Sequence, residues 1–582
     1  MGAGLGWFGV AICAAGPVAA APPPARPRPA APPEASAAGT AEPVEYRLAP
    51  VFERGALAAV AVEMRLRADP SGRTVIDLPD SYGGVKGHWR YLSPIRASGA
   101  TVAAPAPAER VLRSRPGARI TLRYRVRTAY PRDPDAAGGN PYEGAAVRPA
   151  WFAGLGEFLF ATPKGGEAMP ARFAWDRWPA RWTRVSSLDG RAATVADVAE
   201  ANFLAGPAVE LRTRPIRGGR LRLASLGPFA WGADAYADRV AAVVDAQRRF
   251  WNEADGDYTV TLFRLAPSPG SSSFGGTGRS RGFVQYASPD ATPDALFRLI
   301  AHEHQHNWIA RRVGAPPVDG ASAFWFSEGF TDFYTARTLL RAGLWTPAQF
   351  AADLDRALLA AASSPARAYP NSRISADFWT DPAVGQLPYD RGHLFAHLLD
   401  AELRRAGGPG LDAVLFEMRD RWAAAAAKPE LIANLLAVLD ARGFDARPLI
   451  ARHIDAGEPI PLPVDLFGPC ATLEATSLPV FDPGFDRDAS AKAGRFTGVD
   501  PAGAAHAAGL RDGMARVARL GGEEGDARVP LRYRVRDARG DEREIAWLPA
   551  GRARFTAAQV RLTGAADPAR LAECRARMSG AR

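Results

Sequence analysis

Lysine is the residue that this sequence most conspicuously lacks: it occurs only at positions 86, 164, 428 and 492 of the 582 residues, and the rest of the 72 lysine and arginine residues are arginine. The formal net charge is +10, yet the arginines gather into neither a basic tail nor a basic helix face. The arginine excess accompanies abundant alanine, glycine and proline. It therefore indicates a coding bias rather than a nucleic-acid-binding surface, and we expect no nucleic-acid partner.

Long apolar runs are also missing. After the first twenty residues there is no run of about 18 apolar residues, which excludes a multi-span membrane protein. Residues 1–21 are apolar and end in small residues, so they predict a secretory signal peptide. Cys13 within them would suit a lipoprotein, but the bulky Ile12 before it argues against lipidation. Residues 22–43, mostly Pro and Ala, predict a flexible linker. We expect a periplasmic or secreted protein without a membrane span once the signal is removed.

Cysteine is scarce, with three in the chain. Removal of the signal peptide would leave Cys470 and Cys574, and in an oxidising compartment such a pair can link one domain by a disulfide. Two separate buried thiols are the alternative. We favour the disulfide because the two cysteines bracket a compact C-terminal module.

The pattern of apolar residues predicts an α+β multidomain protein. Short β-branched runs separated by Gly, Pro and Asp predict an N-terminal β-sandwich-like domain at 44–228. A helical period then predicts a mostly helical domain at 229–462, and short strands return in a small β domain at 463–582. Residues 269–282 are expected to form a glycine-rich loop. The helices expected after this loop are Asp294–Arg312, Trp325–Ala342, Pro347–Ser363, Asp390–Ala406, Gly410–Ala424 and Pro429–Arg442.

The most informative motif is His302-Glu303-x-x-His306, in a chain that has only eight histidines. Residues four apart share one face of a helix, so His302 and His306 can bind one metal ion. Glu303 lies about 100° around the helix, where it can reach a water on that metal without replacing it. The packing alternative is costly, because three histidines within five residues would be buried on one core helix. We assign no role to His304.

A third metal ligand is expected downstream, since a catalytic zinc needs three protein ligands and an open position. Glu328 is the lone carboxylate in an aromatic helix start, where it is costly unless paired or bound to metal. Asp332, four residues later on the same face, can accept the spare N–H of a ligand histidine. The alternative for Asp332 is an ordinary helix-surface residue.

Tyr389, in Pro388-Tyr389-Asp390-Arg391-Gly392, can donate a hydrogen bond to the oxyanion that develops during attack on a carbonyl. The alternative is a half-buried aromatic residue. His393 and His397 are also four apart and form a rival metal pair. They lack an accompanying Glu, and the leucines and phenylalanine around them indicate a core helix instead.

These motifs resemble those of the glycyl aminopeptidases, zinc peptidases of the gluzincin group with a C-terminal PDZ domain. The matching blocks are HExxH with Asn-Trp, Trp-x-x-Glu-Gly-Phe-Thr-Asp-x-Tyr, Tyr-Asp-x-Gly and residues 452–462. The resemblance implies a thermolysin-like catalytic domain preceded by a β-rich domain. It also implies zinc on His302, His306 and Glu328, with Glu303 as general base and Tyr389 stabilising the transition state. Residues 499–513 resemble a PDZ segment, which implies a peptide C-terminus as a possible partner there.

One stretch departs from the family pattern. The family reads Gly-Gly-x-Glu-His before the zinc helix, and its Glu is expected to hold the free amine of the substrate. This chain has Gly275 and Gly276 followed by Thr, and then Gly278 and Arg279 in the Glu and His positions. We expect Gly275 and Gly276 to let an extended peptide pair with the backbone. Arg279 would favour a substrate carboxylate, a blocked N-terminus or internal cleavage, or else be a solvated loop residue.

The sequence therefore predicts an exported zinc metallopeptidase acting on a peptide or protein. Zinc would lower the pKa of its bound water to about 7, and Glu303 would take the proton and pass it to the leaving amine. A catalytically lapsed peptide-binding scaffold and a zinc hydrolase of a non-peptide substrate remain alternatives. The same ligand set also binds cobalt or manganese.

Overall fold

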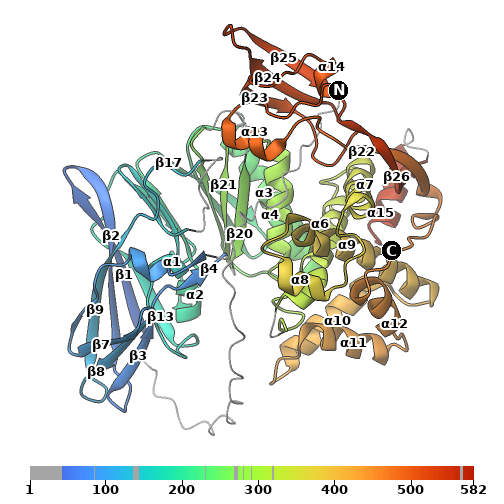
Figure 1. Cartoon of the computed structure of the whole chain (residues 1–582). Coiled ribbons are helices and arrows are strands. Elements are labelled where there is room, and N and C mark those ends of the chain that lie inside the picture. Colours follow the sequence, from blue (N-terminus) through green and yellow to red (C-terminus); the bar gives the residue numbers. More distant parts are fainter. Residues whose placement is uncertain are drawn as a thin grey trace.

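The computed structural model describes residues 42–581 except 84, 136–142, 230, 268–272, 280, 290, 318–319 and 564–567. The predicted signal peptide, 1–21, and all but the last two residues of the predicted linker lie outside the described residues. Figure 1 shows a β-rich part, a helical part and a small module that is joined to the helical part by a pair of long strands. The chain is thus a mixed α/β multidomain protein.

The β-rich part consists of three larger sheets, a two-stranded sheet of β4 and β5, and short helical elements. Its strands alternate inward and outward: in β9, Ile120, Leu122, Tyr124 and Val126 face the core between exposed arginines. The six-stranded sheet has the order β15 (Ala193–Thr194), β13 (Pro170–Trp175), β1 (Val44–Glu53), β2 (Ala56–Arg67), β9 (Arg119–Arg127) and β6 (Arg96–Ser98). The two four-stranded sheets are β12 (Thr162–Pro163), β3 (Arg73–Asp77), β8 (Glu109–Arg113) and β7 (Thr101–Ala106), and β10 (Ala146–Arg148), β11 (Trp151–Leu155), β16 (Asn202–Gly206) and β14 (Thr183–Ser186). The short elements are β4 (Ser81–Tyr82), β5 (Val85–Lys86), η1 (His88–Tyr91), α1 (Gly156–Leu159) and α2 (Val195–Ala199).

A five-stranded sheet connects the β-rich part with the helices (Figure 1). Its order is β17 (Val209–Ile216), β18 (Gly219–Leu226), β19 (Tyr258–Arg264), β21 (Gly282–Ala287) and β20 (Phe274–Arg279). Because β18 pairs in parallel with β19, the hairpin β17–β18 belongs with the helical domain rather than with the N-terminal domain at 44–228. The expected glycine-rich loop likewise contains a strand, β20, at the edge of this sheet.

The helical part begins with α3 (Ala233–Trp251) and α4 (Pro293–Gln305), which pack against each other. The expected helix at Trp325–Ala342 is broken at Glu328 into two helices, and the helix expected from Asp390 begins eight residues earlier, at Pro382. The remaining elements are η2 (Ala321–Ala323), α5 (Phe324–Ser327), α6 (Gly329–Arg341), α7 (Pro347–Ser363), α8 (Ser372–Asp377), α9 (Pro382–Arg405), α10 (Leu411–Ala424), α11 (Leu431–Ala441), α12 (Arg447–Leu449) and η3 (Ile450–Asp455).

The C-terminal region divides differently from the predicted domain at 463–582. Its outer segments form a two-stranded ribbon of β22 (Ala471–Phe481) and β26 (Ala550–Leu562), preceded by η4 (Gly468–Cys470) and followed by α15 (Pro568–Met578). Side chains of these segments share one core cluster with α6 and α7. Only residues 482–549, called the C-terminal module below, have a separate core. The module contains α13 (Arg487–Ala493), α14 (Ala504–Ala507) and a sheet of β23 (Ala515–Gly521), β24 (Leu531–Arg536) and β25 (Glu542–Trp547).

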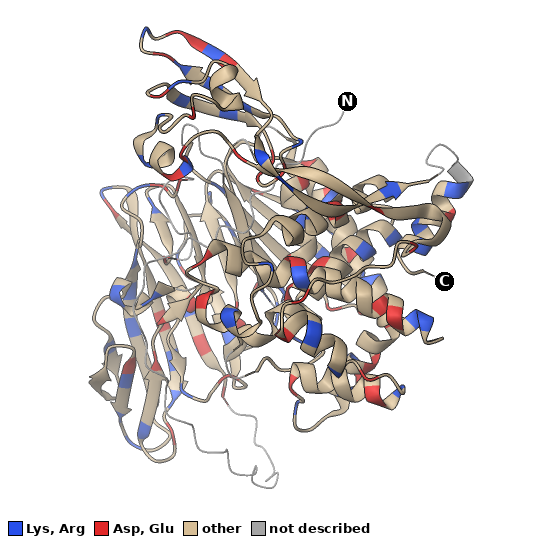
Figure 2. Ribbon diagram, turned by 45° about the vertical axis from the view of Figure 1, so that its right-hand side comes forward, with Lys and Arg blue, Asp and Glu red and all other residues tan. Residues whose placement is uncertain are grey.

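A disulfide with an S–S distance of 2.04 Å joins Cys470 and Cys574. Both cysteines belong to the core cluster shared with α6 and α7, so the disulfide fixes α15 to the base of the ribbon and not to the sheet of the C-terminal module. Among the described residues, no helix is sufficiently long and apolar to cross a membrane. Figure 2 shows basic and acidic residues interspersed along both the β-rich and the helical parts.

Candidate metal centre

Helix α4 carries the first two site residues. The Thr292 side chain accepts a hydrogen bond from the Ala295 N–H and Pro293 occupies the first turn, so the helix start is well defined. The apolar residues Leu296, Leu299 and Ile300 bury one side of the helix under the five-stranded sheet. The helix ends at Gln305, which leaves His306 as its C-terminal capping residue rather than in mid-helix as expected.

Close helix packing determines where Glu328 lies. Glu328 is the residue between α5 and α6, and Gly329 directly after it faces Gly392 of α9. A Cβ atom on Gly392 would overlap the Trp325 carbonyl oxygen, and a Cβ atom on Gly329 would overlap the Gly392 backbone. Only glycine allows this approach, which brings α9 and Tyr389 next to the Glu328 turn.

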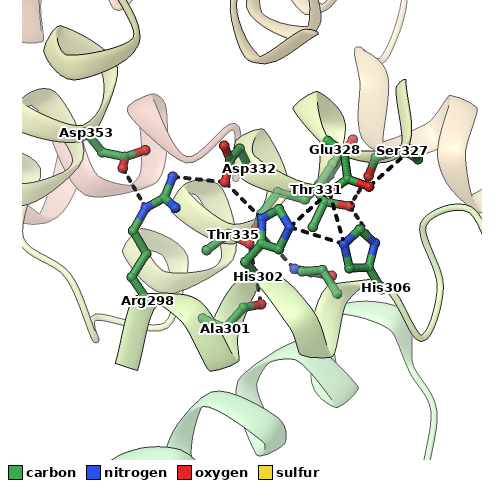
Figure 3. Close-up of polar contacts among 12 residues, drawn as sticks. Arg298, Ala301, His302, His306, Ser327, Glu328, Thr331, Asp332, Thr335 and Asp353 are labelled. Atoms are coloured by element: carbon green, nitrogen blue, oxygen red, sulfur yellow. Dashed lines mark hydrogen bonds and ion pairs between the residues drawn. The ribbon is translucent and has the colours of Figure 1, made fainter. Parts of the chain in front are cut away.

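Three potential ligand atoms converge at one point. His302 Nε2 lies 3.1 Å from His306 Nε2 and 3.3 Å from Glu328 Oε2, and His306 Nε2 lies 3.4 Å from the same oxygen. Figure 3 shows these side chains meeting between α4 and α6. A tetrahedral zinc with bonds of 2.0–2.1 Å requires ligand–ligand distances of about 3.3–3.4 Å. The donor set therefore fits zinc, and within the described residues it is the only cluster of three such groups.

Both histidines are oriented by a second contact. His302 Nδ1 lies 2.9 Å from Asp332 Oδ1, and His306 Nδ1 lies 3.4 Å from Thr331 Oγ1. Thr331 donates its own proton to the Ser327 carbonyl oxygen, so its hydroxyl oxygen can accept from His306. Each Nδ1 is then the protonated nitrogen, which leaves each Nε2 lone pair for the metal.

Asp332 is buried, with 5% of its side chain exposed, and is not a helix-surface residue. Although burial alone would raise its pKa, the Arg298 guanidinium and His302 hold the pKa of Asp332 well below its ordinary value. Burial alone would lower the pKa of His302, but Asp332 and Glu328 raise it to about 10 in the metal-free chain. The pocket thus attracts positive charge to the point where the ligand atoms meet.

Glu303 is held by the edge strand of the sheet. Its Oε2 accepts a hydrogen bond of 2.7 Å from the Gly278 N–H, and a Cβ atom on Gly278 would lie 3.0 Å from the same oxygen. Gly275 and Gly276 are also needed for packing, because their missing side chains make room for Tyr286 and Phe283 of β21. β20 therefore runs directly beside the general-base candidate.

Tyr389 lies on α9 at the edge of the ligand cluster, with its ring centroid 6.1 Å from that of His302. Burial, together with the carboxylates of Glu328 and Glu303, holds the pKa of the Tyr389 hydroxyl well above its ordinary value. The hydroxyl therefore remains a protonated hydrogen-bond donor over the physiological range.

Arg279 is buried, with 4% exposure, so it is not a solvated loop residue. Its Nε donates to the Glu200 carbonyl oxygen at 2.9 Å, one terminal nitrogen donates to Tyr82 Oη at 2.9 Å, and the other forms an ion pair with Glu157. All of these partners belong to the N-terminal part. The geometry therefore supports an anchor between β20 and the N-terminal part rather than direct contact with a substrate carboxylate.

The other histidines of the sequence analysis serve packing. His393 and His397 stack with ring centroids 5.2 Å apart, and His397 is surrounded by Phe333, Phe350 and Phe467. His304, to which no role was assigned, donates from Nδ1 to Gln247 Oε1 at 2.7 Å and thereby fixes α4 to α3. The pKa of His304 lies well below its ordinary value because the ring is buried, so it remains neutral.

Two site residues were not predicted from the sequence. Thr331 lies within the Glu-Gly-Phe-Thr-Asp block, and its position one residue before Asp332 was the only available signal. Arg298 lies four residues before His302 on α4, so helical spacing was the one signal that could have indicated it. Its two carboxylate partners lie on α6 and α7, and the sequence does not show how these helices pack against α4.

Comparison with known proteins agrees with this site. Residues 295–386 match the model of the M61 glycyl aminopeptidase family. This match includes both histidines of the HExxH motif and Glu328, and it ends before Tyr389. No curated protein matches the chain.

Solved structures share the fold at low sequence identity. The crystal structure of an aminopeptidase N family protein from Idiomarina loihiensis is 15% identical and has a TM-score of 0.62, and the alignment covers 91% of this chain and 99% of that one. An M1 zinc metallopeptidase from Deinococcus radiodurans is 17% identical with a TM-score of 0.46, covering 72% of this chain and 96% of that one, and a variant of it was solved with a Tyr-Ser-Ala substrate. The chain thus has a fold similar to that of the aminopeptidase N family, and its match to the M61 glycyl aminopeptidases over 295–386 supports a zinc-metallopeptidase-like function.

Proposed function

We propose that this protein is a zinc-dependent peptidase that hydrolyses peptide bonds with Glu303 as general base. The spacing of His302 Nε2, His306 Nε2 and Glu328 Oε2, which matches the edges of a tetrahedral zinc site, is the observation that carries the proposal. Zinc held there would act as a Lewis acid, polarising the scissile carbonyl and making water nucleophilic near neutral pH.

The chain itself supplies proton transfer and charge stabilisation. Glu303 would accept the proton of the attacking water at its carboxylate and deliver it to the leaving amine nitrogen. Its bond from the Gly278 N–H holds the carboxylate in place during both transfers. The Tyr389 hydroxyl would donate a hydrogen bond to the oxyanion that develops on the carbonyl oxygen.

The substrate is proposed to be an extended peptide alongside β20, because this strand forms the edge of the sheet and ends beside Glu303. Gly278 provides no carboxylate for a free amine, and Glu157 is already paired with Arg279. We therefore propose that peptides with blocked N-termini or internal bonds are cleaved. Export to the periplasm or medium is part of the proposal and is supported by the disulfide. We also propose a PDZ-like role for the C-terminal module in binding peptide C-termini, from the resemblance of residues 499–513 to a PDZ segment.

A defined peptide library with free and blocked N-termini, digested by the zinc-loaded protein and by Glu303→Gln and read by mass spectrometry, tests the proposal. The wild type is expected to cleave at least about 100-fold faster than Glu303→Gln, because general acid–base catalysis contributes 10²–10⁴-fold. Equal, slow turnover by both would contradict the proposal and favour a peptide-binding scaffold or a non-peptide substrate. Loss of single residues from free N-termini only would restore aminopeptidase specificity.

A further inference from the structure

Arg298 lies between two buried aspartates behind the candidate metal centre. One terminal nitrogen of its guanidinium, Nη2, is 2.9 Å from Asp332 Oδ1, and its Nε is 2.8 Å from Asp353 Oδ1. The three side chains are 7%, 5% and 4% exposed. Figure 3 shows the resulting row from Asp353 through Arg298 and Asp332 to His302.

The same carboxylate oxygen joins the row to the metal ligand. Asp332 Oδ1 accepts both from Arg298 and from His302 Nδ1, at 2.9 Å each. The orientation of the His302 ring therefore depends on where this oxygen lies, and the oxygen is fixed from the opposite side by Arg298. Because Arg298 shares α4 with His302 while the aspartates come from α6 and α7, the row also fixes these three helices relative to one another.

The ion pairs continue toward the oxyanion side of the site. Arg356 of α7 is 3.8 Å from Asp353 and 3.4 Å from Asp390, and Asp390 directly follows Tyr389. Asp353 thus connects the row behind His302 with the residue next to Tyr389. A buried ion pair contributes little net stability, because desolvation offsets most of the Coulomb attraction. The ion pairs are therefore better explained by their effect on where these side chains lie than by a gain in stability.

We propose that Arg298 is a positioning residue of the zinc site, which holds Asp332 in the place from which it aims His302 Nε2 at the metal. The inference rests on the proposed zinc site, but not on the identity of the substrate. Without Arg298, Asp332 would be free to turn toward other partners and Asp353 would lose its nearest cation. The consequence would be weaker zinc binding as well as slower catalysis.

Zinc affinity of the full-length protein, measured by competition with a chromophoric chelator, tests this role directly. Arg298→Met is expected to weaken zinc binding about tenfold or more, since residues that orient metal ligands contribute 10–100-fold. Arg298→Lys should recover part of the loss, because an ammonium group can still pair with Asp332. The difference in Tm between the zinc-loaded and zinc-free protein should narrow in parallel.

Arg337→Met is the matched control. Arg337 is 2% exposed and lies between Asp400 at 3.2 Å and Asp412 at 3.4 Å. It also donates to the Ser579 carbonyl oxygen and lies over the Phe333 ring, and none of these partners is a metal ligand. This substitution should lower Tm in zinc-free and zinc-loaded protein alike and leave zinc affinity unchanged. Unchanged affinity in a folded Arg298→Met protein, or an equal loss in Arg337→Met, would overturn the proposal.

Asp353→Asn provides a second route if Arg298→Met does not fold. It keeps Arg298 paired with Asp332 but removes the charge that holds the guanidinium from the other side. Zinc affinity is expected to fall several-fold, less than in Arg298→Met, and wild-type affinity would contradict the positioning role. Because these measurements use zinc alone, they remain decisive even if no peptide is cleaved.

Discussion

Tyr389 illustrates how single residues acquire a role from their surroundings. Carboxylates near its hydroxyl would repel a phenolate, so the hydroxyl stays protonated and can donate a hydrogen bond near the candidate metal centre. Its aromatic ring packs on the cluster that also contacts Tyr369, Phe324 and Ala383. The ring and the hydroxyl can therefore be tested separately.

Tyr389→Phe is expected to lower kcat by about 100-fold, because it removes one oxyanion donor and preserves the ring. Zinc affinity and Tm should stay close to those of the wild type. Tyr369→Phe, in the same cluster, is the matched control and should retain full activity. Steady-state kinetics on a cleaved peptide of the library measures both, and a Tyr389→Phe enzyme with unchanged kcat would exclude the oxyanion role.

The residues of the metal cluster could be predicted from the sequence because helical spacing and the cost of a carboxylate among aromatics are local properties. Asp332 could be predicted from the same helical spacing. Arg279 could not, since its partners Tyr82, Glu157 and Glu200 come from the N-terminal part and no local pattern places them beside β20. Arg298 was missed because its partners Asp332 and Asp353 lie on α6 and α7, and no local pattern shows how these helices pack against α4.

At the scale of elements, helix ends were predictable where capping residues define them. α7 runs from Pro347 to Ser363 as expected, because Thr346 and Gln349 form a capping box. α9 begins earlier than expected, because Asp381 caps it and Pro388, which precedes the helix start expected at Asp390, is accommodated inside it. The glycine-rich segment forms strand β20 because its glycines pack against β21, which is a tertiary effect.

The contact of α9 with the Glu328 turn gives a prediction at this scale. Gly392→Ala should push α9 away from α5, since the added methyl overlaps the Trp325 carbonyl oxygen. We expect a lower Tm and a loss of activity of at least tenfold, by displacement of both Glu328 and Tyr389. Gly232→Ala, at an open position with nothing within 4 Å, is the control and should change neither. Unchanged Tm and activity in Gly392→Ala would contradict the prediction that this close contact of α9 with α5 positions Glu328 and Tyr389.

At the scale of the whole molecule, charged groups of the C-terminal module interact with charged groups of the helical part. Glu523 follows β23 and interacts with Asp526 and Arg528 of the module and with Arg356 of α7. Burial, reinforced by Asp526, raises the pKa of Glu523 to about 7 from an ordinary 4.5. Asp355 of α7, which accepts from the Val560 N–H at 2.6 Å, has its pKa raised to about 6 by burial.

A raised pKa makes the folded protein bind protons more tightly than the unfolded chain. The free energy of unfolding therefore falls as the pH rises from about 4.5 to about 7, and above that range the folded state carries the whole destabilisation from the ionised Glu523. Glu523→Gln should consequently raise Tm at pH 8 and have little effect at pH 5. Glu524→Gln, which removes an exposed pair with Arg487, should show no such pH dependence. Thermal unfolding at both pH values decides, and a lower Tm for Glu523→Gln at pH 8 would contradict the assignment.

The ribbon that carries the C-terminal module also determines how the molecule responds to mechanical force. Its strands pair from Ala471↔Leu562 to Phe481↔Ala550, and the module joins both strands at the second end. A pull on the module would therefore load both strands in the same direction and lift the ribbon off α7 rather than separate its two strands. The disulfide between Cys470 and Cys574 holds the base of the ribbon to α15. Because Arg337 and Arg341 of α6 donate to the Ser579 carbonyl oxygen just after α15, the load would pass into α6, the helix that also carries Asp332.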